Sequence, residues 1–152
     1  MTASTTASIT APIKVDICVI GAGSGGLTVA AGASQLGVSV ALVERDLMGG
    51  DCLNYGCVPS KALLAAGKAA HNIETAGRFG ISGGLLEVDT KAVRQHVRGV
   101  VAGIAPHDSV ERFRALGVNV IQGAACFKGR REIEVDGQTI TARRFVIATG
   151  SS

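Results

Sequence analysis

A glycine-rich turn between a strand and a helix places the strongest limit on how this chain can fold. Residues 14–20 (KVDICVI) predict a short buried strand, and residues 21–26 (GAGSGG) follow it directly. Residues 27–36 have helical composition, and residues 38–43 (VSVALV) predict a second buried strand. Strand, helix and strand in this order form a βαβ unit, in which the two strands are parallel and the crossover is right-handed. Nearly continuous apolar strands indicate a sheet covered on both faces.

The glycines of this turn predict a dinucleotide site. Gly21, Gly23 and Gly26 match the G-x-G-x-x-G pattern. Gly21 allows the tight turn, Gly23 lets the backbone approach a pyrophosphate, and Gly26 lets helix and strand pack closely. The helix that follows offers free amide hydrogens and partial positive charge to the phosphates. Glu44 lies at the end of the second strand, where a carboxylate is expected to bind ribose hydroxyls. FAD and NAD are not separated by this pattern, because both contain adenosine diphosphate.

The remainder of the chain predicts an α/β fold: a Rossmann-like domain with a parallel sheet and a small antiparallel β-meander. Helices are expected over residues 60–73 and 90–105, with Asp89 as the N-cap of the second. Pro106 should kink or break that helix, and a helical segment should continue to Leu116. Strands are expected over residues 118–122, 124–128, 132–135, 139–141 and 144–148, and Asp136-Gly137 predicts a hairpin turn. Residues 1–12 predict a disordered tail before a single domain, residues 13–152.

Composition and charge exclude several classes of function. The formal net charge is only +3, and no Lys/Arg-rich run occurs, so nucleic acid is not an expected partner. No apolar run approaches the ~18 residues of a membrane span, so no membrane association is expected. The first residues lack the basic start and apolar centre of a secretory signal, which favours a cytoplasmic location.

The stretch GGDCLNYGCVPSK, residues 49–61, contains the pair Cys52 and Cys57. Such a pair can form a zinc site, a structural disulfide staple or a redox pair. Zinc is disfavoured, because no further Cys/His cluster lies nearby and paired zinc cysteines are usually two to four residues apart. Cys18 and Cys126 are interpreted as small core residues. So short a disulfide loop would constrain little chain entropy. A redox pair fits better, because Cys57 begins a predicted helix whose N-terminus would stabilise a thiolate.

Four stretches together resemble the class I flavoprotein (pyridine nucleotide-) disulfide oxidoreductases: GAGSGG, VERD, GGDCLNYGCVPSKAL and ATGS. That family includes dihydrolipoamide dehydrogenase, glutathione reductase and mercuric reductase. The resemblance covers nearly the whole chain, from about Val15 to Ser151. Its general pattern favours a dihydrolipoamide dehydrogenase-like or mercuric reductase-like member.

The resemblance implies a role for each matching residue. Gly21, Gly23, Gly26 and Glu44 would hold FAD, Gly50 and Asp51 would line it, and Lys61 would lie near its reactive end. The backbone at Ala124 would touch the adenine, and Ala148, Thr149 and Gly150 would pass close to the cofactor. Cys52 would be the outer thiol that meets substrate, and Cys57 the inner thiol against the flavin. NAD(P)H would reduce the flavin, the flavin would open the Cys52–Cys57 disulfide, and the dithiol would reduce a small-molecule disulfide or mercuric ion.

Two features depart from the family pattern. Position 51 is Asp where the commonest form has Thr, and we expect this carboxylate to raise the pKa of Cys52. Family members are also much longer, so the NAD(P)H domain, the dimerisation domain and the His–Glu pair supplied by the partner subunit of a homodimer are expected to be absent. His71, His96 and His107 are not expected to replace that pair. The chain alone is therefore expected not to turn over. The alternatives are an inactive nucleotide-binding module and an assembly piece that needs a complementary chain.

Overall fold

A computed structural model describes residues 11–82, 84 and 86–151 of the chain. Most of the predicted tail, residues 1–10, lies outside this part. From Ala11 onward the chain is held, since the Gln138 side-chain amide donates a hydrogen bond to the Ala11 carbonyl oxygen at 3.0 Å.

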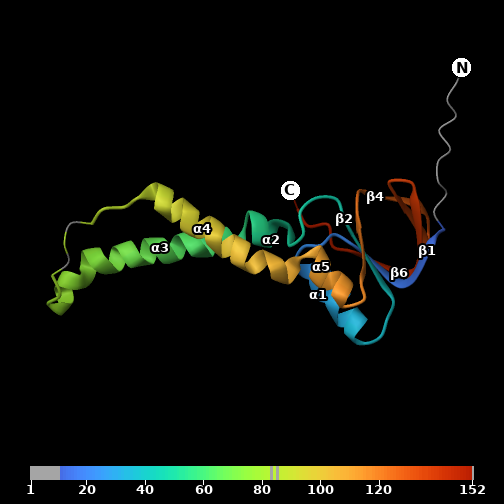
Figure 1. Cartoon of the computed structure of the whole chain (residues 1–152), viewed down its shortest axis with the longest axis horizontal. Coiled ribbons are helices and arrows are strands. Elements are labelled where there is room, and N and C mark those ends of the chain that lie inside the picture. The colour runs from blue at the N-terminus through green and yellow to red at the C-terminus, as the bar shows by residue number, and fades with distance from the viewer. Residues whose placement is uncertain (1–10, 83, 85, 152) are drawn as a thin grey trace, which may run out of the picture.

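The fold contains a six-stranded mixed sheet, which lies at one end of the molecule (Figure 1). Its strands are β1 (Ile13–Ile20), β2 (Val40–Glu44), β3 (Asn119–Gln122), β4 (Ala125–Gly129), β5 (Glu132–Val135) and β6 (Gln138–Ile147). They are arranged in the order β3-β2-β1-β6-β5-β4. The pairs β1–β2, β1–β6 and β2–β3 are parallel, whereas β4–β5 and β5–β6 are antiparallel. The expected α/β fold with a parallel sheet and an antiparallel meander is therefore confirmed.

The helical segments connect these strands. They are α1 (Ser24–Gln35), α2 (Gly50–Asn54), α3 (Cys57–Thr75), η1 (Ala76–Phe79), α4 (Thr90–Ile104), η2 (Ala105–Asp108) and α5 (Val110–Ala115). The predicted N-cap is confirmed, because the Asp89 carboxylate accepts hydrogen bonds from the backbone N–H groups of Lys91 and Ala92. Pro106 lies in η2, the 3-10 segment that follows α4, so the regular α-helix ends there as expected. The short helix α2 was not predicted from the sequence.

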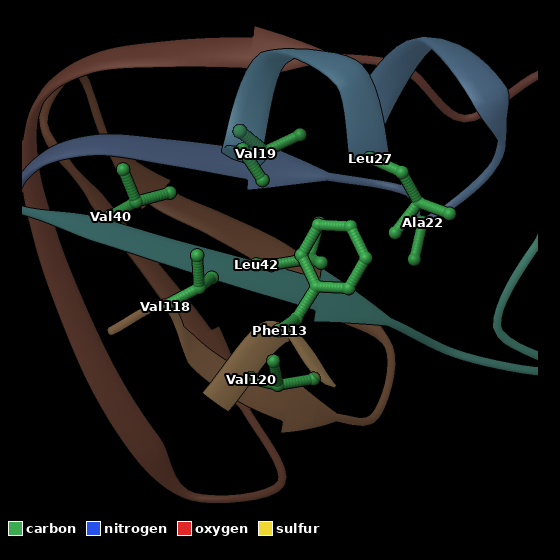
Figure 2. Close-up of a cluster of buried hydrophobic side chains, with 9 residues drawn as sticks. Val19, Ala22, Leu27, Val40, Leu42, Phe113, Val118 and Val120 are labelled. Atoms are coloured by element: carbon green, nitrogen blue, oxygen red, sulfur yellow. The ribbon is translucent and has the colours of Figure 1, made fainter. Parts of the chain in front are cut away.

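One face of the sheet packs against α1 and α5. Figure 2 shows Val19 of β1, Leu42 of β2 and Val120 of β3 gathered around the Phe113 ring of α5. Leu27 and Ala30 of α1 belong to the same buried cluster. Alternate residues of a strand face opposite sides of the sheet, so Cys18, Ala41 and Val43 lie on the other face.

The meander covers that other face. Ala41 and Val43 of β2 form one buried cluster with Ile133 and Val135 of β5, although β1 and β6 lie between these two strands in the sheet order. The sheet must therefore curl over so that β5 packs above β2. Strands β5 and β6 are joined by the predicted Asp136-Gly137 hairpin turn, in which both residues have positive φ, 47° and 84°. Positive φ at both central positions is the geometry of a type I′ turn.

Two expectations about the strands need correction. Residues 139–141 and 144–148 were expected to form separate strands, but β6 is continuous from Gln138 to Ile147. Ala142 and Arg143 contain no turn-forming residue, and Ala142 is buried beside Val15 of β1, so the strand runs through them. Cys126 was expected in the core, but it is exposed because β4 is the outermost strand of the meander. Cys18 is fully buried, as expected.

Helices α3 and α4 pack along each other in an arm that extends away from the sheet (Figure 1). Only Ala62 is buried on α3, and no residue is buried on α4. The arm contributes little to the core, whose large side chains lie in the sheet and in α1 and α5.

Replacing Phe113 by Ala should lower the free energy of unfolding by about 3 to 5 kcal/mol, because a side chain that is only 2% exposed would leave a cavity. Phe79→Ala is the matched control, since this ring is 70% exposed and its removal should cost less than about 1 kcal/mol. Urea unfolding followed by circular dichroism measures both. Equal losses would show that α5 does not anchor the core.

Candidate functional site

A cleft of about 600 Å³ opens where four parallel strands end. Gly21 follows β1, Glu44 ends β2, Gly123 follows β3 and Ala148 follows β6. The crevice outside the carboxyl ends of parallel strands is where open α/β sheets bind ligands. Nine residues predicted to bind cofactor line this cleft: Gly21, Gly23, Glu44, Gly50, Asp51, Ala124, Ala148, Thr149 and Gly150. Two others, Gly26 and Lys61, do not.

The glycine turn is packed too tightly for side chains at two of its positions. A Cβ on Gly21 would overlap the Ala148 carbonyl, and the residue also has a positive φ of 104°. A Cβ on Gly26 would overlap the Gly21 carbonyl oxygen and crowd Val19. Gly23 differs, because its Cβ would meet only the Gly50 Cα, at an ordinary 3.9 Å. Close packing within the chain therefore explains why positions 21 and 26 are glycine. Gly23 instead leaves open space toward the cleft.

Helix α1 reaches this cleft through its N-cap residue, Gly23, which has no side chain to cap the helix. No acidic residue lies in the first turn. The N–H groups at a helix start need partners, and with the helix dipole they favour an anion. The start of α1 can therefore receive a phosphate group.

Glu44 is held rigidly in the wall of the cleft. Only 9% of it is exposed. One carboxylate oxygen accepts a hydrogen bond from the Ala22 N–H at 2.6 Å, and the other accepts one from the Asp46 N–H at 2.9 Å. Each ionised carboxylate oxygen can accept a further hydrogen bond. Glu44 can therefore still bind hydroxyl groups of a ligand while the backbone fixes its position.

The two predicted redox cysteines meet through the short helix α2. The chain turns at Gly49, forms α2 and then closes on itself, since the Tyr55 and Gly56 N–H groups both donate to the Asp51 carbonyl oxygen. This closure places Cys57, the first residue of α3, beside Cys52. Both thiols are free; Cys52 is half-buried and Cys57 is exposed.

The pKa of Cys52 is raised, chiefly by a hydrogen bond between its thiol and the Cys57 side chain and then by burial. Lys61 acts in the opposite direction, because its positive charge favours the thiolate. The pKa of Cys52 is thus raised, as expected. Asp51 is not the cause, because it is not among the groups that shift this pKa. The Asp51 carboxylate instead lies against Gly56, where a Cβ would come within 2.8 Å of its oxygen.

Cys52 lines a second, smaller hollow of about 390 Å³. Ser24 and Thr28 of α1 contribute to it, as do Asp108 and Arg112 from the region of α5. Asp51 and Cys52 are adjacent in the chain, yet one lines the large cleft and the other lines this hollow. Helix α2 therefore forms a wall between two spaces. Cys57 lines neither of them.

Sequence reasoning missed several residues of both spaces. Arg45, Asp46 and Leu47 line the cleft directly after Glu44, and their position after a strand end could have indicated this. Asp108 and Arg112 follow no motif, and only folding brings them to Cys52. Among the described residues, no group of three or more His, Cys, Asp or Glu side chains could hold a metal ion. Within the same part of the chain, no helix combines the length and hydropathy of a membrane span.

Comparison with known proteins gives consistent matches. The pattern of the family described as pyridine nucleotide-disulphide oxidoreductase matches residues 15–152. A dihydrolipoyl dehydrogenase of Thermus scotoductus is 42% identical over 143 residues, which is 90% of this chain and 29% of the relative. A dihydrolipoyl dehydrogenase of Bacillus subtilis is 37% identical over 92% of this chain and 30% of its own length. A mercuric reductase of Staphylococcus aureus is 34% identical over 90% of this chain and 25% of its own. The chain thus spans less than a third of these relatives.

Gly26→Ala should destabilise the chain by about 1 to 3 kcal/mol, because the added methyl group would overlap the Gly21 carbonyl oxygen and the turn would have to move. Gly25→Ala is the matched control: its Cβ would meet nothing within 4 Å, and alanine favours helix over glycine. Thermal unfolding should therefore show a lower Tm for the first variant and an unchanged or higher Tm for the second. The reverse order would contradict the packing described for Gly26.

Cys57→Ala should lower the pKa of Cys52, because it removes the hydrogen bond that stabilises the protonated thiol. A lower pKa means that the thiolate forms at lower pH, so the alkylation rate of Cys52 should rise at lower pH. Mass spectrometry of the Cys52 peptide after pulses of iodoacetamide measures this. Asp51→Asn is the control and should leave the profile unchanged. If the alkylation profile shifted only in Asp51→Asn, Asp51 would be the cause of the raised Cys52 pKa.

Proposed function

The chain belongs to the pyridine nucleotide-disulphide oxidoreductase family, and we propose that it forms the part of such an enzyme that binds FAD and carries the redox pair Cys52–Cys57. The observation that carries this proposal is the wall formed by α2. Residues predicted to bind the nucleotide gather on one side of it, and Cys52 opens to a separate hollow on the other. A cofactor in the cleft and a substrate at Cys52 would therefore lie on different sides of α2.

The large cleft fits a dinucleotide. Its volume of about 600 Å³ lies within the usual range for ligand pockets, about 300 to 1,000 Å³. Gly23 keeps the cleft free of a side chain beside the uncapped start of α1, which suits a pyrophosphate. Glu44 retains acceptor capacity for ribose hydroxyls, at the end of the strand where such a carboxylate is expected. When bound, FAD would supply two-electron transfer between a reduced nicotinamide and the cysteine pair.

The other predicted residues complete this arrangement. Ala124 lies beyond β3, on the same side as Glu44, and would contact the adenine. Ala148, Thr149 and Gly150 follow β6 and would pass close to the cofactor. Gly50 and Asp51 belong to α2, which also carries Cys52, and would line the cofactor. Gly26 would act indirectly, since it shapes the turn but does not line the cleft.

With a disulfide substrate, the cysteine pair would exchange electrons by thiol–disulfide chemistry. The Cys52 thiolate attacks one sulfur of a substrate disulfide, and the other substrate sulfur leaves and takes up a proton. The Cys57 thiolate then attacks the Cys52 sulfur of this mixed disulfide. The second substrate thiol leaves with a proton, and the Cys52–Cys57 disulfide forms. The two cysteines are thereby oxidised by two electrons, and the substrate disulfide is reduced by two. Lys61 favours the first step, because its charge stabilises the Cys52 thiolate.

The substrate is proposed to be a small-molecule disulfide or mercuric ion, with NAD(P)H as the electron donor and a homodimer as the complete enzyme. Support comes from relatives named dihydrolipoyl dehydrogenase and mercuric reductase, of which the chain spans 29% and 25%. Because the matched part covers only this share, the chain by itself is proposed to bind FAD and to carry the thiols without completing NAD(P)H-dependent turnover.

The purified chain mixed with FAD should acquire a bound-flavin absorption spectrum. Addition of a dithiol should add a long-wavelength charge-transfer band, because an electron-rich thiolate at Cys57 would contact the flavin. Cys57→Ala should retain the flavin and lose the band, whereas Cys126→Ser, a change at an exposed cysteine on β4, should retain both. Failure to bind flavin would contradict the cofactor assignment. Flavin binding with no band in the unchanged chain would support the inactive nucleotide-binding alternative.

A further inference from the structure

A basic hollow of about 660 Å³ lies at the end of the sheet opposite the cleft. It is formed where β1 and β2 begin, together with the β4–β5 turn and the middle of β6. Its charged residues are Lys14, Arg130, Arg131, Arg143, Asp16 and Glu132. These six residues are called the basic hollow below. Neither the family resemblance nor the proposed redox chemistry assigns them a role.

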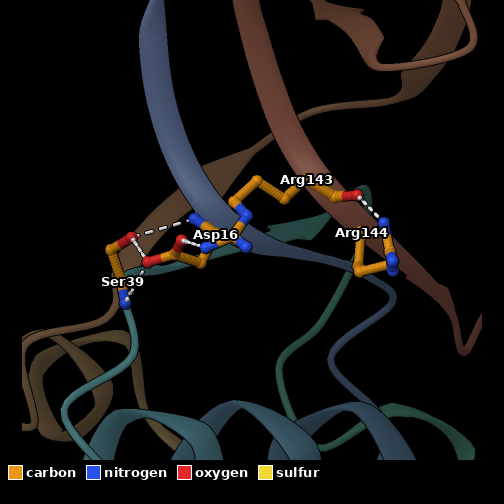
Figure 3. Close-up of polar contacts among 4 residues, drawn as sticks. All are labelled: Asp16, Ser39, Arg143 and Arg144. Carbon is orange, nitrogen blue, oxygen red and sulfur yellow. Dashed lines mark hydrogen bonds and ion pairs between the residues drawn. The ribbon is translucent and has the colours of Figure 1, made fainter.

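Only part of this charge is balanced within the chain. Figure 3 shows Asp16 between Ser39 and Arg143. The Asp16 carboxylate accepts a hydrogen bond from the Ser39 hydroxyl at 2.6 Å and from the Arg143 guanidinium at 3.1 Å. These two hydrogen bonds, led by that of Ser39, lower the pKa of Asp16, so it is charged near neutral pH. Among the described residues, Lys14, Arg130 and Arg131 have no carboxylate within 4.0 Å. The hollow is therefore net positive.

The two arginines of the turn are not explained by local structure. Arg130 and Arg131 form the two-residue turn between β4 and β5, and both are exposed. Turns of this length favour Asn-Gly or Asp-Gly, as the chain uses at Asp136-Gly137. Neighbouring like charges repel each other. A partner of opposite charge would compensate this repulsion.

We propose that the basic hollow docks an acidic polypeptide segment. All four cationic side chains are exposed, and 79% of the Arg143 side chain is accessible. A single exposed ion pair contributes little, so a small anion that meets one or two of these groups would bind weakly. An extended acidic segment could meet several cations at once, and complementary charge would also guide its approach.

The composition of the hollow favours a polypeptide over a nucleic acid. Two carboxylates, Asp16 and Glu132, line it among the cations and would repel a phosphate backbone. A mixed acidic peptide can place a lysine or a backbone N–H there. No aromatic side chain lines the hollow, so single-stranded bases would find no stacking surface.

Docking at this end would leave the redox site accessible. The basic hollow lies where the parallel strands begin, and the cleft lies where they end. An acidic partner could therefore hold the chain without covering Cys52 or the cleft. This inference does not depend on the proposed redox function, because it concerns residues that take no part in it.

Fluorescence anisotropy of a short, labelled, glutamate-rich peptide tests the proposal on the whole chain. Binding should be detectable at low salt and should weaken at high ionic strength, as expected for exposed charges. The double variant Arg130→Glu with Arg131→Glu should raise the Kd at least about tenfold. The charge-matched control is Arg94→Glu with Arg98→Glu, which changes two exposed arginines on α4, and it should leave the Kd within about twofold.

A second double variant tests whether misfolding explains the loss of peptide binding. Arg130→Gln with Arg131→Gln removes the charges without reversing them and should cause an intermediate loss of affinity, while circular dichroism should remain unchanged in every variant. The proposal would be overturned by absence of peptide binding, by an equal or greater loss in the α4 control, or by tighter binding of a DNA oligonucleotide of equal net charge that the turn variants also abolish. None of these results depends on flavin binding, so they are distinct from failure of the proposed function.

Discussion

The close backbone contact between the glycine turn, the start of α1 and the end of β6 is the constraint on which the site depends. Gly26 lies against the Gly21 carbonyl, and Gly21 lies against Ala148. This contact seats α1 directly behind β1 and aligns the ends of β1 and β6 at one edge of the sheet. Because β2 and β3 run parallel to β1, Glu44 and Gly123 reach the same edge. A cleft lined largely by backbone and small residues results, which suits an extended cofactor.

The cysteine pair depends on this packing as well. Gly23 and Gly49 form an isolated parallel bridge, so the glycine turn also anchors the start of α2. From there a single short helix separates the cleft from the hollow of Cys52 and ends where α3 begins at Cys57. The cleft and the two thiols therefore belong to one connected arrangement. The opposite end of the sheet takes no part in this arrangement, and the excess positive charge there has no evident structural role.

Much of the fold could be predicted because local signals and global packing agree. Apolar runs marked β1 and β2, Asp89 marked the start of α4, and Asp136-Gly137 marked the hairpin. The errors occurred where local signals were weak. No turn-forming residue marks a break at Ala142, but the continuity of β6 also depends on its pairing with β1, which the local sequence does not show. Cys126 has apolar neighbours, but its exposure depends on β4 being an edge strand. The pKa of Cys52 depends on Cys57 and burial, whereas sequence proximity had pointed to Asp51.

The sequence by itself determined the family, the βαβ unit and nine of the residues that line the cleft, because short motifs impose strict steric and chemical requirements on consecutive positions. Only the tertiary structure decided how these residues divide between two spaces. Asp51 and Cys52 are neighbours in the chain, yet they line different spaces, because the strand ends lie on one side of α2 while α1 and α5 lie on the other. Likewise, Lys14, Arg130 and Arg143 are far apart in the sequence, and the sheet alone brings their charges together. Long-range packing sets both arrangements, and no local pattern encodes it.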